Sequence, residues 1–314
     1  MSINIPDHYT ISFSTNVMLL LQEKGSKLRS CVTEGRYTGK QASPVDQIGA
    51  VEMLDVTNRF APMGRVDASV DRRWVTPSDF DLPQLIDTFD KLRLLTDPES
   101  HYTQNAVMAA GRKMDTLIIR AFLAVAKTGE QGATSTSFGN AVSGQNQVTV
   151  SFGATNSKLT VAKLADIKRQ MRANHVDFDT EEIYCALTAA DEASLLNEIQ
   201  IISSDFNGGE RPVLKEGRVQ RFLGINFVYC EQVEAIAGKG LGVAPTGGTA
   251  NTNLAEIPVW ARSGMHLGIW NDVQTEISRR NDLRGVPWQS YVTASFGATR
   301  LQENMVYNVE SYRA

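Results

Sequence analysis

The residues that could do chemistry form two groups, and the first is a glycine-rich run around Lys239. A phosphate-binding loop needs a strand before it, a helix after it, and a Lys-Ser or Lys-Thr pair at its end. Here Lys239 precedes another glycine, Pro245 interrupts the run, and the following residues lack a helical pattern. We interpret the run as a surface loop, with an unrecognised enzyme using it as an alternative. Its glycines include Gly240, Gly242, Gly247 and Gly248.

The second group is a cluster of carboxylates at Asp177, Asp179, Glu181 and Glu182. Such a cluster could bind a metal ion or transfer protons. Only His175 lies beside it, and no glycine is placed as in a calcium-binding loop. We predict a solvated turn between a helix and a strand.

Other catalytic patterns are missing from the sequence. Neither GxSxG nor HExxH occurs, and the four histidines stand in unlike contexts. The three cysteines, Cys31, Cys185 and Cys230, are widely spaced and form no CxxC pair. We therefore predict no catalytic residue, no metal site and no cofactor, in a protein made in a reducing cytosol.

Composition narrows the class of protein further. With 42% apolar and 21% charged residues in a chain of 314, we expect a globular protein of two or three subdomains. A net charge of −4 argues against tight nucleic-acid binding through a basic face. The N-terminus lacks the pattern of a signal peptide, and no apolar run is long enough to span a membrane.

One long helix is predicted over residues 97–128. Asp97 can cap it, Pro98 suits its first position, and Gly129 can end it. About 30 residues span roughly 45 Å, a length that suits a strut in an assembly. An apolar stripe follows the helical period and is expected to pack inward; it consists of Val107, Ala110, Met114, Leu117, Ile118, Ala121, Phe122 and Val125.

Before this helix we predict a two-stranded ribbon, from Val51–Phe60 and Asp71–Asp79, and an N-terminal arm. Neither is stable alone, so each needs a neighbour, which can be another copy of the chain. Trp and Arg often anchor protein–protein contacts. The candidate inter-subunit contacts are Arg65, Asp67, Asp71, Arg72, Arg73, Trp74 and Phe80.

Further elements follow from local patterns. An eight-residue echo between 148–155 and 292–299 indicates two strands that end in similar glycine turns. We predict helices over Leu82–Leu95, Thr160–Asn174 and Asp191–Ile199; strands over Glu182–Thr188 and Trp260–Glu276; a strand pair around Gly224; and a terminal hairpin of Gln289–Phe296 and Asn304–Val309.

This order of parts resembles the major capsid proteins of tailed bacteriophages, which have the Hong Kong 97-type fold. The lead into the long helix, Leu85 to Tyr102, resembles the family's segment before its spine helix. The stretches Gly217–Tyr229 and Phe296–Val309 resemble its central strand pair and closing hairpin. The likeness covers residues 45–314.

The resemblance implies an α+β Hong Kong 97-like fold without catalytic apparatus. It implies an arm (1–45), an extended β-ribbon loop (46–90), a peripheral domain (91–174 and 266–314) with spine helix 97–128, and an axial domain (175–265). The glycine-rich loop would then lie near the axis of a capsomer.

It also implies a function. Copies would join as pentamers and hexamers into an icosahedral shell that encloses double-stranded DNA without reading its sequence. A separate scaffolding protein and a portal would be partners, assembly would occur in the host cytoplasm, and the product would be a virion. The alternative is the shell of a cellular encapsulin compartment, which is similar in fold.

Overall fold

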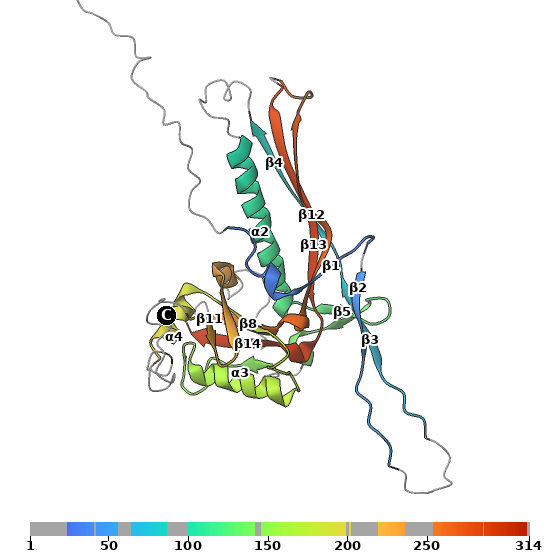
Figure 1. The fold of residues 1–314 in the computed structure, drawn as a ribbon, viewed down its shortest axis with the longest axis vertical. Coiled ribbons are helices and arrows are strands. Elements are labelled where there is room, and N and C mark those ends of the chain that lie inside the picture. The colour runs from blue at the N-terminus through green and yellow to red at the C-terminus, as the bar shows by residue number, and fades with distance from the viewer. Residues whose placement is uncertain are drawn as a thin grey trace, which may run out of the picture.

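Three β-sheets and three α-helices organise the residues that the computed structural model describes. These residues are 24–40, 42–55, 64–86, 99–141, 146–198, 201, 219–235, 254–284 and 286–312. The molecule is elongated: a long sheet and a helix extend from one end of the body, and a ribbon projects from it in the opposite direction (Figure 1).

The long sheet has the strand order β1-β12-β13-β4 and carries α2 on one face (Figure 1). Its centre is the antiparallel pair β12 and β13, and the short β1 runs parallel to the inner end of β12. Buried side chains of α2 pack against Ala294 and Phe296 of β13. The bounds are β1 Thr33–Arg36, β4 Ser78–Ile86, α2 Glu99–Leu123, β12 Met265–Arg279 and β13 Trp288–Arg300.

The six-stranded sheet has the order β7-β14-β11-β8-β10-β9 and is covered by α3. Thr160 caps α3 by accepting a hydrogen bond from the Lys163 backbone N–H at 3.5 Å, and Leu164 and Ile167 of the helix are fully buried. The bounds are β7 Gln147–Val148, α3 Val161–Ala173, β8 Ile183–Leu187, α4 Ala189–Leu196, β9 Arg221–Phe222, β10 Ile225–Tyr229, β11 Leu254–Ala261 and β14 Val306–Tyr312.

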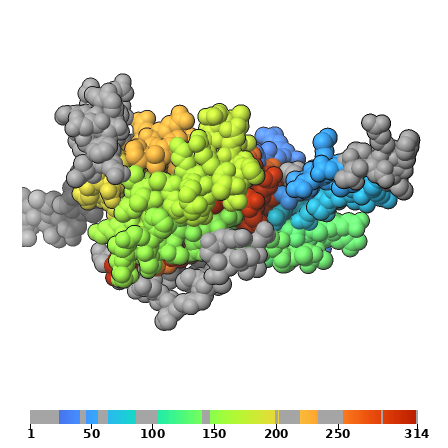
Figure 2. Space-filling model, turned by 90° about the horizontal axis from the view of Figure 1, so that it is seen from below, coloured from blue at the N-terminus to red at the C-terminus, as the bar shows by residue number. Residues whose placement is uncertain are grey.

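The third sheet, β2-β3-β5-β6, forms the base of the ribbon. Seen from below, α3 lies in the centre of the molecule, and the ribbon strands and β5–β6 project together to one side (Figure 2). The bounds are β2 Ala42–Ile48, β3 Val70–Val75, β5 Ala126–Thr128 and β6 Thr134–Thr136.

The long helix is shorter than predicted. It ends at Leu123 because Ala126–Thr128 pairs as β5 with both β3 and β6, so the backbone there makes ladder bonds instead of helical ones. Its predicted first residues, 97 and 98, lie outside the described residues.

Two predictions before this helix are wrong over the residues that the structure describes; 56–60 and 87–95, the remaining parts of the two predicted elements, lie outside them. Leu82–Leu95 was expected to be helical after Pro83, but residues 78–86 form β4, with Pro83 opposite Tyr291. Proline is tolerated there because β4 is an edge strand. Val51–Phe60 was expected to be the first ribbon strand, yet Ala42–Ile48 pairs with β3 and residues 51–55 belong to no strand.

The predicted terminal hairpin is also wrong. β13 pairs with β12 and β4, whereas β14 pairs with β11 and β7 in another sheet. A one-turn 3₁₀ helix, η6 (Glu303–Met305), separates them. The echo at 148–155 and 292–299 is likewise no pair of similar turns, because Gly297 lies inside β13. Sheet membership also differs from the predicted domain limits, since β14 belongs to the same sheet as β8 and β10, and α3 packs on that sheet.

The described part of the predicted arm packs on its own chain. Asp115 of α2 is fully buried and accepts hydrogen bonds from the Ser26 hydroxyl and from the backbone N–H groups of Lys27 and Leu28. A Cβ on Gly111 would lie 2.4 Å from Gly25, so glycine allows this close approach. Residues 1–23 lie outside the described residues.

Candidate functional site

The ribbon is the most exposed apolar feature of the described residues. We define it as β2, β3 and the extended residues 49–55 and 64–69 beyond them. The last ladder bond runs from the Gly49 N–H to the Ser69 carbonyl at 2.6 Å. Large apolar side chains are 46% to 100% exposed along the ribbon, a pattern typical of a protein-binding surface. They are Ile48, Val51, Met53, Leu54, Val66 and Val70.

Four of the predicted contact residues lie on the surface or edge of this ribbon. Arg65 and Asp67 form an exposed ion pair at 2.7 Å, and Arg72 pairs with Asp46 of β2 at 2.5 Å. Asp71 accepts a hydrogen bond from the Gly129 N–H at 3.0 Å. Ion pairs as exposed as Arg65–Asp67 and Arg72–Asp46 contribute little to stability.

The other three predicted contact residues are held inside the chain. The Trp74 indole N–H donates to the Gly129 carbonyl at 2.7 Å. Phe80 lies 5.6 Å from Phe296, between ring centroids, and is covered by Lys113. Arg73 is only 5% exposed, so predicting its guanidinium as an inter-subunit contact was wrong.

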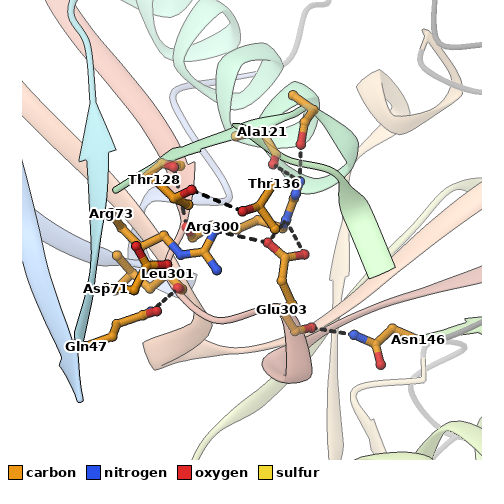
Figure 3. A network of polar contacts seen from close by, with 12 residues as sticks. Gln47, Asp71, Arg73, Ala121, Thr128, Thr136, Asn146, Arg300, Leu301 and Glu303 are labelled. Atoms are coloured by element: carbon orange, nitrogen blue, oxygen red, sulfur yellow. Dashed lines mark hydrogen bonds and ion pairs between the residues drawn. The ribbon is translucent and has the colours of Figure 1, made fainter. Parts of the chain in front are cut away.

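Arg73 belongs to a buried ionic network at the base of the ribbon, which we call the junction (Figure 3). It consists of Arg73 on β3, Arg300 at the end of β13, and Glu303 in η6. Arg73 Nη1 lies 3.4 Å from Glu303 Oε1, and Arg300 Nε lies 3.1 Å from Glu303 Oε2. None of the three is more than 5% exposed.

Arg300 also binds the C-terminal end of α2. Its Nη1 donates to the carbonyls of Ala121 at 3.1 Å and Phe122 at 2.8 Å, and to that of Ala124. These carbonyls have no helical partner and carry the negative end of the helix dipole. A cation buried there stabilises the helix terminus, and this contact contributes to the helix stopping short of residue 128.

The junction has one more positive than negative side chain. Two guanidinium groups share one carboxylate, and the helix end supplies further negative potential to Arg300. Burial lowers the pKa of Arg300, and Glu303 opposes that shift. Arg73 Nε and Arg300 Nη2 have no hydrogen-bond partner within the described chain. Losing Glu303 would therefore leave two buried cations without a counter-ion.

Further hydrogen bonds connect the junction to all three sheets. The Glu303 carbonyl accepts from Asn146 Nδ2 at 2.6 Å, next to β7 of the six-stranded sheet. The Leu301 carbonyl accepts from Gln47 Nε2 of β2. The junction thus joins the ribbon, the end of α2 and the two larger sheets (Figure 3).

Sequence analysis missed Arg300 and Glu303. The available signal was weak: two opposite charges three residues apart, just after a strand of alternating character. Such a pair usually indicates a solvated turn. Only the packing of α2 and η6 over it shows that this one is buried.

The predicted inward stripe of the long helix is partly confirmed. Met114, Ile118, Ala121 and Phe122 are buried, and Leu117 is partly buried against the same cluster. Val107 and Val125 are exposed, so their assignment was wrong. Ala110 lies at the margin of the buried face. The buried face of the helix is displaced by one residue from the predicted stripe at some positions, and it also includes Ala106, Asp115 and Ile119.

The other candidate sites are the axial-loop glycines and the carboxylate cluster. The axial-loop glycines at 240, 242, 247 and 248 lie outside the described residues. The carboxylate cluster forms the predicted turn between α3 and β8, where Asp177 accepts from the Asp179 N–H at 3.0 Å. In the described ranges no His, Cys, Asp and Glu side chains are grouped to hold a metal ion. Among the helices described, none is long and apolar enough to cross a membrane.

Comparison with known proteins gives a consistent result. A family model described as phage capsid protein matches residues 5–311. No curated protein matches the chain. Solved structures match over nearly the whole chain, at identities that establish the fold alone.

The capsid structure of cyanophage Pam1 gives a TM-score of 0.72 at 13% identity and covers 100% of this chain and 99% of its own. The capsid structure of cyanophage P-SCSP1u gives a TM-score of 0.71 at 13% identity, with 98% of this chain and 94% of that chain covered. The capsid structure of Helicobacter pylori bacteriophage KHP30 gives a TM-score of 0.70 at 10% identity, with 99% of each chain covered. The α+β fold is therefore that of Hong Kong 97-like capsid proteins.

Proposed function

The chain belongs to the phage capsid protein family and is a major capsid protein, and we propose that its copies join as pentamers and hexamers of an icosahedral shell. Contacts in which one surface meets a different surface of the next copy can close into rings, and rings into a shell. Contacts that are weak individually add up when each copy makes several. The encapsulin and enzyme alternatives gain no support from the comparisons.

The observation that carries this proposal is the projecting ribbon. It exposes six large apolar side chains, which belong to neither hydrophobic core. Exposed apolar surface of this kind is typical of a site that binds another protein. A neighbouring copy is the partner that a capsid supplies, and the role we infer is structural, without catalysis.

As a capsid protein the chain is a component of the virion. We propose that it is assembled in the host cytoplasm with a separate scaffolding protein and a portal, and that the shell encloses double-stranded DNA. The net charge of −4 supports enclosure without tight binding, because a basic inner surface would hold DNA by releasing its counterions.

Negative-stain electron microscopy of the expressed protein tests this proposal. We expect uniform polyhedral shells, or rings of five and six copies. Small isolated particles at every protein concentration would contradict it. Shells that contain a cargo protein instead of DNA after expression with the phage's other proteins would favour the encapsulin alternative.

A further inference from the structure

The ribbon is attached to the body at its base, and Arg73 and Trp74 of β3 lie at this attachment. β3 pairs with β5 through Arg73 and Trp74, and β5 follows directly after α2. The ribbon base is thus coupled to the end of the helix. Beyond the Gly49–Ser69 hydrogen bond, residues 50–55 and 64–68 belong to no strand.

Within the junction, Glu303 is the group that links these parts. Arg300 Nε lies 3.1 Å from Oε2 and 3.3 Å from Oε1 of the Glu303 carboxylate. Arg300 also donates a hydrogen bond to the Phe122 carbonyl at the end of α2. Arg73 reaches the same carboxylate from β3 at 3.4 Å. The weaker contact is therefore on the ribbon side, and the stronger contacts are on the side of the body.

We propose that Glu303 is a positioning latch: clamped by Arg300, it holds Arg73 and fixes the angle at which the ribbon leaves the end of α2. Because the ribbon is the surface that we assign to a neighbouring copy, this angle sets the inclination between neighbours and hence the curvature of the shell. This inference rests on the proposed function. In this proposal the base of the ribbon keeps the same geometry in pentamers and hexamers. The part of the ribbon beyond Gly49 changes its conformation to fit each of them.

Arg72 and Arg73 provide a matched pair for the test. Both are arginines of β3 in ion pairs, but Arg72 pairs with Asp46 within the ribbon, whereas Arg73 pairs with Glu303 of the body. Replacing each by methionine keeps most of the side-chain length and removes the charge. Hydrogen exchange of the β2 and β3 amides and the distribution of shell diameters are then compared with those of the unmodified protein.

For Arg73→Met we expect amide exchange in β3 to rise by about tenfold, the effect of losing one buried charged hydrogen bond, and shell diameters to become heterogeneous. For Arg72→Met both readouts should stay close to the unmodified values. Exchange in α3, which packs on the six-stranded sheet and not on β3, should change in neither variant. Equal behaviour of the two variants would overturn the latch, as would an equal rise of exchange in α3 and β3.

The double variant Arg73→Met/Glu303→Gln separates a latch from a general loss of packing. If the two groups act through one contact, the double variant should show no faster β3 exchange than the more affected single variant. Fully additive effects would overturn the proposal. Exchange can be read on free subunits, so the absence of shells from the unmodified protein would refute the proposed function but leave the latch testable.

Discussion

At the scale of single residues, His266 shows how burial sets a charge state. The Thr33 hydroxyl donates its only proton to the Met265 carbonyl at 2.7 Å, so its oxygen accepts from His266 Nδ1–H at 3.0 Å. His266 Nε2 then accepts from the Tyr37 hydroxyl at 2.9 Å. This arrangement requires a neutral imidazole, and burial lowers the pKa of His266 to about 4.

The contribution of His266 to the stability of the protein should therefore fall in acid. The unfolded chain binds the proton with the ordinary pKa of 6.5, so the contribution of His266 is complete above that pH and is lost as the pH falls towards 4. Between about pH 7.5 and about pH 5 the expected loss of the His266 contribution is about 2 kcal/mol in the free energy of unfolding. Denaturant titration of free subunits at the two pH values measures it as the difference in pH dependence between the unmodified protein and His266→Gln.

His266→Gln is the control for this prediction, since it removes the titrating group. A second buried group acts in the opposite direction: Glu256 faces Glu310 across the β11–β14 ladder, and burial, with a smaller effect of Glu310, raises the pKa of Glu256 to about 7. Its contribution is lost as the pH rises from 4.5 to 7, in both proteins. An equal pH dependence of the variant and the unmodified protein would contradict the role of His266.

At the scale of elements, α2 depends on one buried face. Ile118 is fully buried between the helix and the long sheet, whereas Val107 of the same helix is 44% exposed. Ile118→Asp should destabilise the fold by about 4 kcal/mol or abolish it, because it buries an unpaired charge. Val107→Asp should cost less than about 1 kcal/mol. Soluble yield and thermal unfolding distinguish them, and equal tolerance of both changes would contradict the packing of α2.

Substitutions in the ribbon should distinguish residues that stabilise the fold from residues that act in assembly. Trp74 donates a hydrogen bond to the Gly129 carbonyl and packs on Gly132. Trp74→Ala should therefore lower the free energy of unfolding by about 2 kcal/mol, which a residue that acted only in assembly would not do.

Met53 is fully exposed, so Met53→Ser should leave thermal unfolding unchanged and reduce shell yield. Normal shell yield from Met53→Ser would argue against the ribbon as an interface.

The sequence predicted the elements whose signals are local. α3, β8 and the strand pair around Gly224 follow from apolar periodicity, a Thr cap and a turn glycine, and all are present. β4 was missed because its partner, β13, lies about two hundred residues away, and Pro83 looks like the start of a helix when no partner strand is known. The β13–β14 hairpin was wrong for the same reason, since neighbours in sequence joined different sheets.

The junction could not be predicted from sequence at all. Arg73 was selected for its charge and its tryptophan neighbour, both of which are typical of an interface. Its partner Glu303 is 230 residues away, and nothing local indicates that an Arg–Glu pair after β13 is buried. Buried ionic networks depend on long-range packing, so they become visible only once the sheets have been assembled.

At the scale of the whole molecule, charge and function are linked through the genome. A shell wall that bound DNA tightly would hinder its packing and its release, and tight nonspecific binding requires many phosphate contacts by Lys and Arg. With a net charge of −4, free subunits should bind double-stranded DNA more weakly than about 100 µM at physiological salt. A gel-shift titration measures this, and a parallel titration at about 50 mM salt strengthens any electrostatic binding and shows that the assay would detect it. A band shift at low micromolar protein in physiological salt would show a concentrated basic surface, and would mean that the wall binds the genome rather than only enclosing it.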